Sequence, residues 1–149
     1  MDTPLVETVE FRGHPNVSAI HRTTLEVTTE AELTPRGHCI IGVSADKGAA
    51  GLSDAMKAHI RAGGRLRFEL RVGGRTFEFE GWGSRHLELS DATSIVIRRS
   101  SFVSPRTVAI RSTAAAADVP RAIVSELRGG ARGLLIISAM APDPIRGTS

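Results

Sequence analysis

The feature of this sequence that most constrains its fold is an internal repeat. Residues 33–40 read LTPRGHCI and residues 103–110 read VSPRTVAI, an offset of 70. Further along, GLSDAMKAHIRAGGR from Gly51 matches DVPRAIVSELRGGAR from Asp118 at an offset of 67. Two copies are too few to stack as a solenoid, so the pattern is typical of duplication followed by fusion. We therefore expect two halves of related design.

Both halves predict the same order of elements. A long strand, at 16–28 in the first half and 86–98 in the second, precedes a proline turn and a short apolar strand. Apolar residues at i, i+3, i+4 and i+8, counted from Leu52 and from Val119, then indicate an amphipathic helix. Each helix stops at a Gly-Gly pair, and one more strand closes the half.

A hairpin is expected to join the two halves. The stretch LRVGGRTFEFE alternates apolar and polar residues on both sides of Gly73-Gly74, which suits a two-residue turn. Counting outward from that turn pairs Leu70 with Phe77 and Phe68 with Phe79 on the inner face.

Together these elements predict a mainly β (α+β) fold class. We expect a pseudo-symmetric β-sandwich or barrel made from two β-β-α-β halves with two short helices. The halves run over about 10–70 and 78–137 of a single domain, 1–149, and residues 142–149 are expected to form a flexible tail.

Composition excludes several classes of protein. The chain is 41% hydrophobic and lacks the run of about 18 apolar residues that a membrane helix needs. The start, MDTPLVETVEF, has neither the basic flank nor the apolar stretch of a secretory signal, and the single cysteine, Cys39, agrees with a reducing compartment. We expect a cytoplasmic protein with no membrane-spanning segment and no membrane partner.

The basic residues gather in the second part of the chain. Residues 91–149 hold eight arginines against four acidic residues, whereas the whole chain has a formal charge of only +3. Guanidinium groups suit phosphate recognition, although so small a surplus is also typical of a solvated surface. The first functional hypothesis is a binding module for RNA or another phosphate-bearing partner, with contacts from Arg36, Arg98, Arg99 and Arg106.

The second hypothesis is a polar pocket around His21. The alternation from Val17 to Val27 puts this imidazole on the apolar row of the expected strand, where both ring nitrogens need partners. At an offset of 70 His21 aligns with Asp91, so halves related by an axis could bring the two side chains into one cleft. The expected pocket residues are His14, Asn16, His21, Thr23, Thr24 and Glu26.

This pocket would belong to an enzyme or a small-ligand-binding protein. His21 would be the acid, base or ligand, Asn16 and Thr24 would orient it by hydrogen bonds, and Asp91 would hold the imidazole. The alternative that stays open is a structural histidine that holds a turn through hydrogen bonds.

His38 and Cys39 do not predict a metal site. Adjacent residues of a strand point to opposite faces, so the two rarely bind one ion. We expect no metal and no cofactor, and the ligand, the reaction and the oligomeric state are left open.

Three stretches of the sequence resemble one known family: EFRGHPNVSAIHRTTLEVT, LTPRGHCIIGVSADK and RVGGRTFEFE. Across nearly the whole chain they are similar to an archaeal family catalogued as domain of unknown function 371. The resemblance implies a mostly β, sandwich-like or barrel-like domain from a cytoplasmic archaeal source, and it implies no activity. The chain departs from the family's Gly-Asp-Cys pattern at Gly37-His38-Cys39, which removes an acidic role there. The positions that match the rest of the pattern are Gly13, His14, Asn16, His21, Thr23, Thr24 and Glu26.

Overall fold

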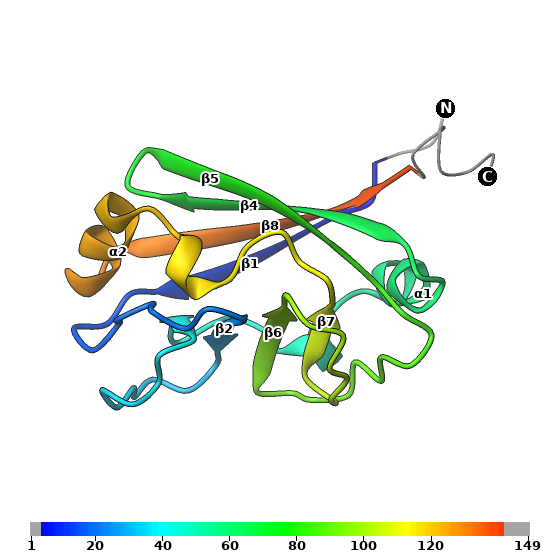
Figure 1. The fold of residues 1–149 in the computed structure, drawn as a ribbon, viewed down its shortest axis with the longest axis horizontal. Helices are drawn as coiled ribbons and strands as arrows, with labels where there is room; N and C mark the ends of the chain where they lie inside the picture. Colours follow the sequence, from blue (N-terminus) through cyan, green and yellow to red (C-terminus); the bar gives the residue numbers. More distant parts are fainter. Residues whose placement is uncertain (1–3, 142–149) are drawn as a thin grey trace.

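Two four-stranded sheets, A and B, face each other in the structure, a computed structural model that describes residues 4–141 (Figure 1). The fold is mainly β with two short helices, as the sequence predicts. The first half contains β1 (Val6–Arg12), β2 (Thr24–Thr28), β3 (Ile40–Gly42), η1 (Ala49–Gly51), α1 (Asp54–Arg61) and β4 (Arg65–Val72). The second half contains β5 (Arg75–Trp82), β6 (Ser94–Arg98), β7 (Thr107–Ala109), η2 (Ala116–Asp118), α2 (Arg121–Arg128) and β8 (Arg132–Met140). The expected tail, 142–149, lies outside the described residues.

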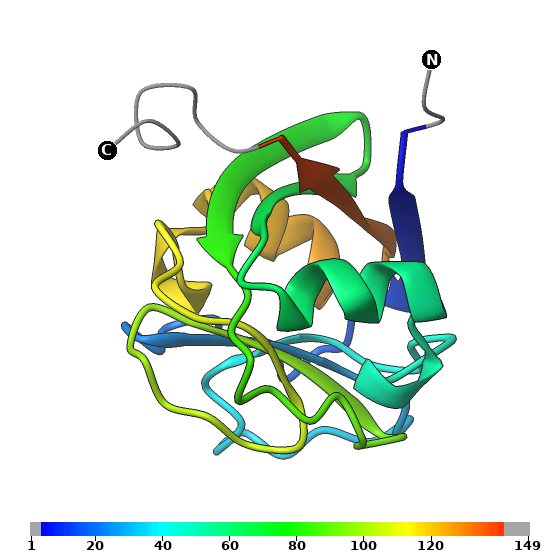
Figure 2. The ribbon, with the colours of Figure 1, turned by 90° about the vertical axis from the view of Figure 1, so that its right-hand side faces the viewer.

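Sheet A has the antiparallel order β1-β8-β4-β5, and sheet B has the order β3-β2-β6-β7. In sheet B the central pair β2-β6 is antiparallel, while β3 and β7 join it in parallel. Single antiparallel bridges, Arg12 to Val43 and Trp82 to Ile110, connect the edges of the two sheets, which gives the fold a barrel-like closure. Figure 2 shows both helices lying between the sheets, and Figure 1 shows them at opposite ends.

The hairpin between the halves has the predicted register. Leu70 pairs with Phe77 and Phe68 pairs with Phe79, whose ring stacks on that of Phe68 at a centroid distance of 5.0 Å. The turn forms because Gly73 (φ 56°) and Gly74 (φ 79°) adopt left-handed conformations that other residues avoid.

Both helices end where the sequence predicts, just before the Gly-Gly pairs. The Ser53 hydroxyl accepts a hydrogen bond from the Met56 N–H at 3.1 Å and caps α1. Beyond α1 and α2 the chain turns at Gly63 and Gly130, both in the left-handed region. None of the helices within residues 4–141 is long and apolar enough to cross a membrane.

The prediction of long strands at 16–28 and 86–98 is wrong. β2 starts at Thr24 and β6 at Ser94, and irregular chain precedes each of them. Ala19 (φ 50°) and Leu89 (φ 54°) lie in the left-handed region, which breaks an extended strand. The alternation read through Ala19 therefore does not apply, and His21 is exposed rather than directed inward.

Corresponding backbone hydrogen bonds recur in the two halves, but with a different alignment from the one expected. The His38 carbonyl accepts from the N–H groups of Ile20 and His21, and the Pro105 carbonyl accepts from those of Ser90 and Asp91. His38 therefore corresponds to Pro105, an offset of 67 in place of 70.

The reason is the length of one connection. The chain between β2 and β3, 29–39, is three residues longer than the chain between β6 and β7, 99–106. The shared Pro-Arg pairs at 35–36 and 105–106 thus lie at different places in the two turns. Cys39 corresponds to Arg106 and not to Ala109, because the Cys39 carbonyl accepts from β2 at 2.8 Å and the Arg106 carbonyl accepts from β6 at 2.9 Å. Duplication as the origin of the two halves stays a prediction.

Candidate functional site

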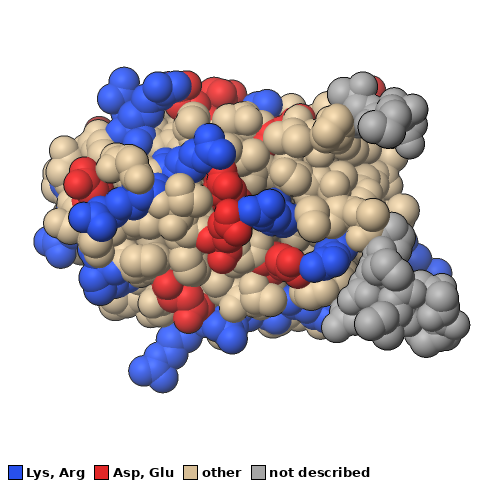
Figure 3. Space-filling view, turned by 90° about the horizontal axis from the view of Figure 1, so that it is seen from above, with Lys and Arg blue, Asp and Glu red and all other residues tan. Residues whose placement is uncertain are grey.

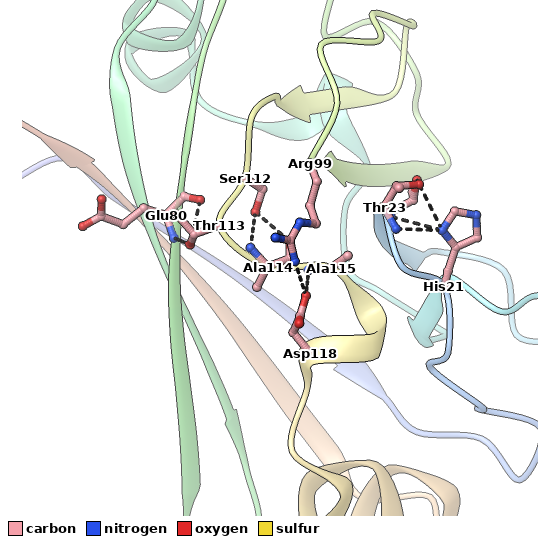
Figure 4. A network of polar contacts seen from close by, with 10 residues as sticks. His21, Thr23, Glu80, Arg99, Ser112, Thr113, Ala114, Ala115 and Asp118 are labelled. Carbon is pink, nitrogen blue, oxygen red and sulfur yellow. Dashed lines mark hydrogen bonds and ion pairs between the residues drawn. The ribbon is translucent and has the colours of Figure 1, made fainter.

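His21 holds the start of β2. Its Nδ1 faces the N–H groups of Thr23 and Thr24 at 3.3 and 3.2 Å, and the contacts to Thr23 are drawn in Figure 4. The Asp91 carboxylate accepts from the Ser94 N–H at 2.7 Å in the same way at the start of β6. Both side chains thus support turns, which is the geometry of the structural alternative for His21.

The structure does not bring His21 and Asp91 together. β2 and β6 are antiparallel, with Thr24 opposite Arg98 and Thr28 opposite Ser94. His21 precedes one end of this ladder and Asp91 precedes the other, and five strand residues span about 13 Å. A His-Asp pair in one cleft is therefore not formed.

His14 and Asn16 also make local contacts. The His14 Nδ1 accepts from the Asn16 N–H at 3.0 Å, and the Asn16 side-chain amide donates to the Leu33 carbonyl at 2.7 Å. Asn16 thus fixes the long connection between β2 and β3, and neither residue contacts His21.

A groove of about 500 Å³ lies on the outer face of sheet B. Its floor is formed by Glu26 and Thr28 of β2 and Ser94 of β6, which are 5%, 3% and 4% exposed. Of the residues predicted to carry function, Glu26, Asp91 and Arg106 line this groove and His21 does not. We call it the sheet B groove; its lining consists of Glu26, Thr28, Glu30, Glu32, Leu33, Thr34, Gly37, Ile40, Asp91, Thr93, Ser94 and Arg106.

The Glu26 carboxylate is buried with long polar contacts. The Cys39 thiol donates to it at 3.6 Å, and one Arg106 nitrogen lies 3.6 Å from its other oxygen. Burial raises the pKa of the Cys39 thiol to about 11, and the charge and hydrogen bond of Glu26 add to the effect. At neutral pH the thiol is therefore a protonated donor to Glu26 and a poor nucleophile.

Ser94 contributes a hydroxyl without a protein partner. Its backbone N–H is bonded to Asp91, but within residues 4–141 its Oγ makes no hydrogen bond. The neighbouring Thr28 hydroxyl accepts from the Glu30 N–H at 3.2 Å. The floor therefore offers a ligand one free hydroxyl beside one carboxylate.

The charges around the sheet B groove are mostly negative. Four carboxylates line it, from Glu26, Glu30, Glu32 and Asp91, against the single guanidinium of Arg106. The described residues contain no group of three or more His, Cys, Asp and Glu side chains arranged to hold a metal ion.

A basic and aromatic cluster lies on the other side of the same face. The Arg98 Nε donates to the Thr107 hydroxyl at 3.0 Å, and its guanidinium carbon lies 4.8 Å from the centre of the Phe102 ring. Burial lowers the pKa of Arg98, and the nearby charge of Arg106 lowers it further. Phe102 is 60% exposed, so its ring is accessible beside the two arginines.

The four arginines predicted to act together do not form one surface. Arg99 is directed to the Asp118 carboxylate at 2.8 Å, as Figure 4 shows, whereas Arg98 lies on the outer face of sheet B. Arg36 is exposed on the connection between β2 and β3. Only Arg98 and Arg106, of these four, are close enough to influence each other.

The outer face of sheet A carries charges of both signs, which Figure 3 shows intermixed. Two of the arginines of sheet A are paired across strands: Arg65 with Glu80 at 2.7 Å and Arg132 with Glu10 at 2.8 Å. This face therefore lacks the single-sign potential that a phosphate backbone requires.

The groove residues Thr28 and Ser94 were missed by sequence reasoning. One signal was present, because Glu26 and Thr28 alternate with the apolar Leu25 and Val27 and so share the outer face of β2. No comparable signal marks Ser94, whose free hydroxyl depends on what the surrounding loops leave uncovered.

Comparisons with known proteins identify relatives of the chain. The model of a family described as "Domain of unknown function (DUF371)" matches residues 9–140. A protein of the archaeon Methanocaldococcus jannaschii, described as uncharacterized, is 42% identical over 122 residues, which cover 82% of this chain and 90% of the relative.

Proposed function

The chain belongs to the DUF371 family, and since that description names no activity we propose a function from the geometry: the protein binds a small ligand in the sheet B groove. Binding sites for small molecules are typically concave, of 300 to 1,000 Å³, with a few polar groups that converge on the ligand. The sheet B groove, at about 500 Å³, has such a volume and combines carboxylates with a hydroxyl.

The observation that carries the proposal is the Ser94 hydroxyl. It is on a residue 4% exposed, lines the groove and has no partner within residues 4–141. The Ser94 Oγ is not a fully buried atom, so it is open to the groove. A ligand that contacts Ser94 and Glu26 together would use hydrogen-bonding capacity that the protein itself leaves unused.

Two observations favour binding over catalysis. The Nδ1 of His21 is occupied by the turn before β2, and His21 does not line the groove. The Cys39 thiol, with a pKa of about 11, lacks the thiolate needed for nucleophilic attack.

Thermal denaturation tests this function. Wild-type protein and the groove-filling variant Ser94→Leu are melted with millimolar probes that cover amines, guanidines, carboxylates, inorganic phosphate and sugars. A ligand that binds the folded state raises Tm. We expect at least one probe class to raise Tm of the wild type and not of Ser94→Leu; no shift with any class, or equal shifts in both proteins, contradicts the proposal.

A second candidate function is the binding of single-stranded RNA, a phosphate-bearing partner. The observation that favours it is the exposed Phe102 ring beside the guanidinium groups of Arg98 and Arg106. Bases stack on exposed aromatic rings, and arginines neutralise the phosphates that connect them. Such a site would use the basic cluster and leave the acidic groove unoccupied. A cytoplasmic location fits either candidate and stays part of the proposal.

A further inference from the structure

We propose that the ligand of the sheet B groove carries a guanidinium at the end of an apolar stem. This inference rests on the proposed small-ligand function and specifies the chemical class of that ligand. It follows from a comparison of the groove with the same place in the second half of the chain.

Thr28 and Arg98 are corresponding residues. The Thr28 carbonyl accepts from the Ala45 N–H and the Arg98 carbonyl accepts from the Ser112 N–H, both at 2.9 Å. Each residue also ends its strand in the antiparallel β2-β6 ladder. A threonine thus stands in the first half where the second half has an arginine.

In the second half the arginine side chain occupies the outer face of the sheet. Arg98 extends to the Thr107 hydroxyl at 3.0 Å and lies over the Phe102 ring. Thr107 is in turn bonded to the Ser104 hydroxyl at 2.7 Å. The fold therefore accommodates a guanidinium on an apolar stem at this location.

In the first half the corresponding side chains are shorter or apolar. Ile40 corresponds to Thr107 and Gly37 to Ser104, because each pair closes the same turn: the Ile40 N–H donates to the Gly37 carbonyl, and the Thr107 N–H donates to that of Ser104, both at 3.1 Å. Thr28, Gly37 and Ile40 all line the groove. The groove thus lies where the second half holds the Arg98 side chain.

The charges of the groove complement a cation. Glu26 on the floor has its nearest polar contacts at 3.6 Å, longer than an ordinary charge-assisted hydrogen bond, so it retains acceptor capacity. Glu30, Glu32 and Asp91 add negative charge around it, against the single Arg106. Leu33 and Ile40 give an apolar wall for a stem, and the Ser94 hydroxyl can accept from an N–H group. An anion would instead be repelled.

Isothermal titration calorimetry with three probes tests the requirement for a guanidinium. Agmatine has a guanidinium on a four-carbon stem, and N-carbamoylputrescine, its urea analogue, is neutral at that end with nearly the same shape. Both probes carry a primary ammonium at the other end, so they differ only in the guanidinium. The blocked peptide acetyl-Gly-Arg-Gly-amide offers the same group from a peptide. We expect agmatine to bind at least about tenfold more tightly than the urea analogue, since charge-assisted hydrogen bonds are roughly twice as strong as neutral ones.

The two sources of a guanidinium separate in this experiment. Agmatine binding without peptide binding indicates a free small molecule, and peptide binding indicates an arginine side chain of a partner; both support the guanidinium. Equal affinity for agmatine and the urea analogue, or no binding of either agmatine or the peptide, overturns it. If Tm rises with another probe class while agmatine does not bind, the small-ligand function survives and the cation inference fails.

A variant that supplies the arginine internally gives an independent test. In Thr28→Arg the new side chain should fill the groove as Arg98 fills its own half, so agmatine binding is lost while the fold is retained. Thr8→Arg adds the same charge on an exposed position of β1 in sheet A and should bind agmatine as wild type does. Agmatine binding by folded Thr28→Arg with wild-type affinity contradicts the inference.

Thr28→Arg could fail for lack of space, so a second variant leaves the floor intact. Glu30→Gln combined with Glu32→Gln removes two exposed rim charges. We expect at least about a threefold loss of agmatine affinity at low salt, reduced at high salt because salt screens exposed charges. Unchanged affinity at low salt counts against the cation.

Discussion

The imidazole of His21 and the carboxylate of Asp91 accept equivalent backbone hydrogen bonds at the starts of β2 and β6. The His21 Nδ1 faces the Thr24 N–H at 3.2 Å, and the Asp91 Oδ2 accepts from the Ser94 N–H at 2.7 Å. Different acceptors in corresponding positions thus serve one turn in each half. The exchange of histidine for aspartate is therefore no evidence of catalysis, and the sheet B groove is the better candidate site.

This relationship predicts how His21 responds to substitution. His21→Ala removes the acceptor and should lower the free energy of unfolding by about 0.5–1.5 kcal/mol, as for other lost hydrogen bonds. His21→Asp restores a carboxylate acceptor and should recover most of the loss. Urea denaturation measures both, with His86→Ala as an exposed control. Equal losses in His21→Ala and His21→Asp would show that the imidazole has another role.

Two corresponding glycines should be intolerant of alanine. A Cβ on Gly13 would lie 1.9 Å from the Leu127 carbonyl oxygen, and one on Gly83 would lie 1.9 Å from that of Ile60. Because both helices would have to move, each alanine variant should lose at least about 2 kcal/mol in urea denaturation. Gly129→Ala is the control, since its nearest atom would be 3.4 Å away. Stability losses near zero at Gly13 and Gly83 would contradict the close approach of chain and helix.

The Cys39 thiol should react slowly with iodoacetamide until the pH approaches 11. Its pKa is raised in the folded state, so the thiolate is scarce at pH 8. Stability from the neutral thiol should be complete below the unfolded pKa, near 9, and be lost as the pH rises through 11. Alkylation rates from pH 7 to 11 measure this, and Glu26→Gln should bring the rise to lower pH. Modification at pH 8 as fast as that of a free thiol would contradict the buried contact.

The RNA candidate makes a prediction about salt. If Arg98 and Arg106 contact phosphates, the double variant Arg98→Ala, Arg106→Ala should weaken binding of a single-stranded oligonucleotide and reduce the slope of log K against log salt by about 1.4. Arg99→Ala is the control, since Arg99 is paired with Asp118 elsewhere. Fluorescence anisotropy from 50 to 300 mM salt measures the slope. Affinity independent of salt, or equal losses in the control, would remove this candidate.

Local signals in the sequence were sufficient for the helices and the hairpin. Both helices have regular apolar spacing and paired glycines after their last turn, and Gly73-Gly74 fixes the hairpin register. The strand boundaries were not predictable in this way, because Ala19 and Leu89 adopt left-handed conformations that their side chains do not announce.

The groove depends on relationships that one strand cannot reveal. Glu26 and Thr28 were visible as an outward polar row, but the space above them exists because Thr28 and Arg98 correspond and differ in size. The sequence did not reveal the correspondences around the groove, because the Pro-Arg pairs at 35–36 and 105–106 favour an alignment of the turns that is shifted by three residues. The correspondence is defined by the β2-β6 ladder and by the turn hydrogen bonds, which join residues far apart in the sequence.

The most direct test of a cation in the sheet B groove is a titration of 15N-labelled protein with agmatine, followed by amide chemical shifts. The largest changes should fall on Thr28 and Ser94, while Thr24 and Arg98, the corresponding residues at the other end of the ladder, change little. Changes of equal size at both ends, or changes confined to residues outside the groove, would contradict the assignment of the site.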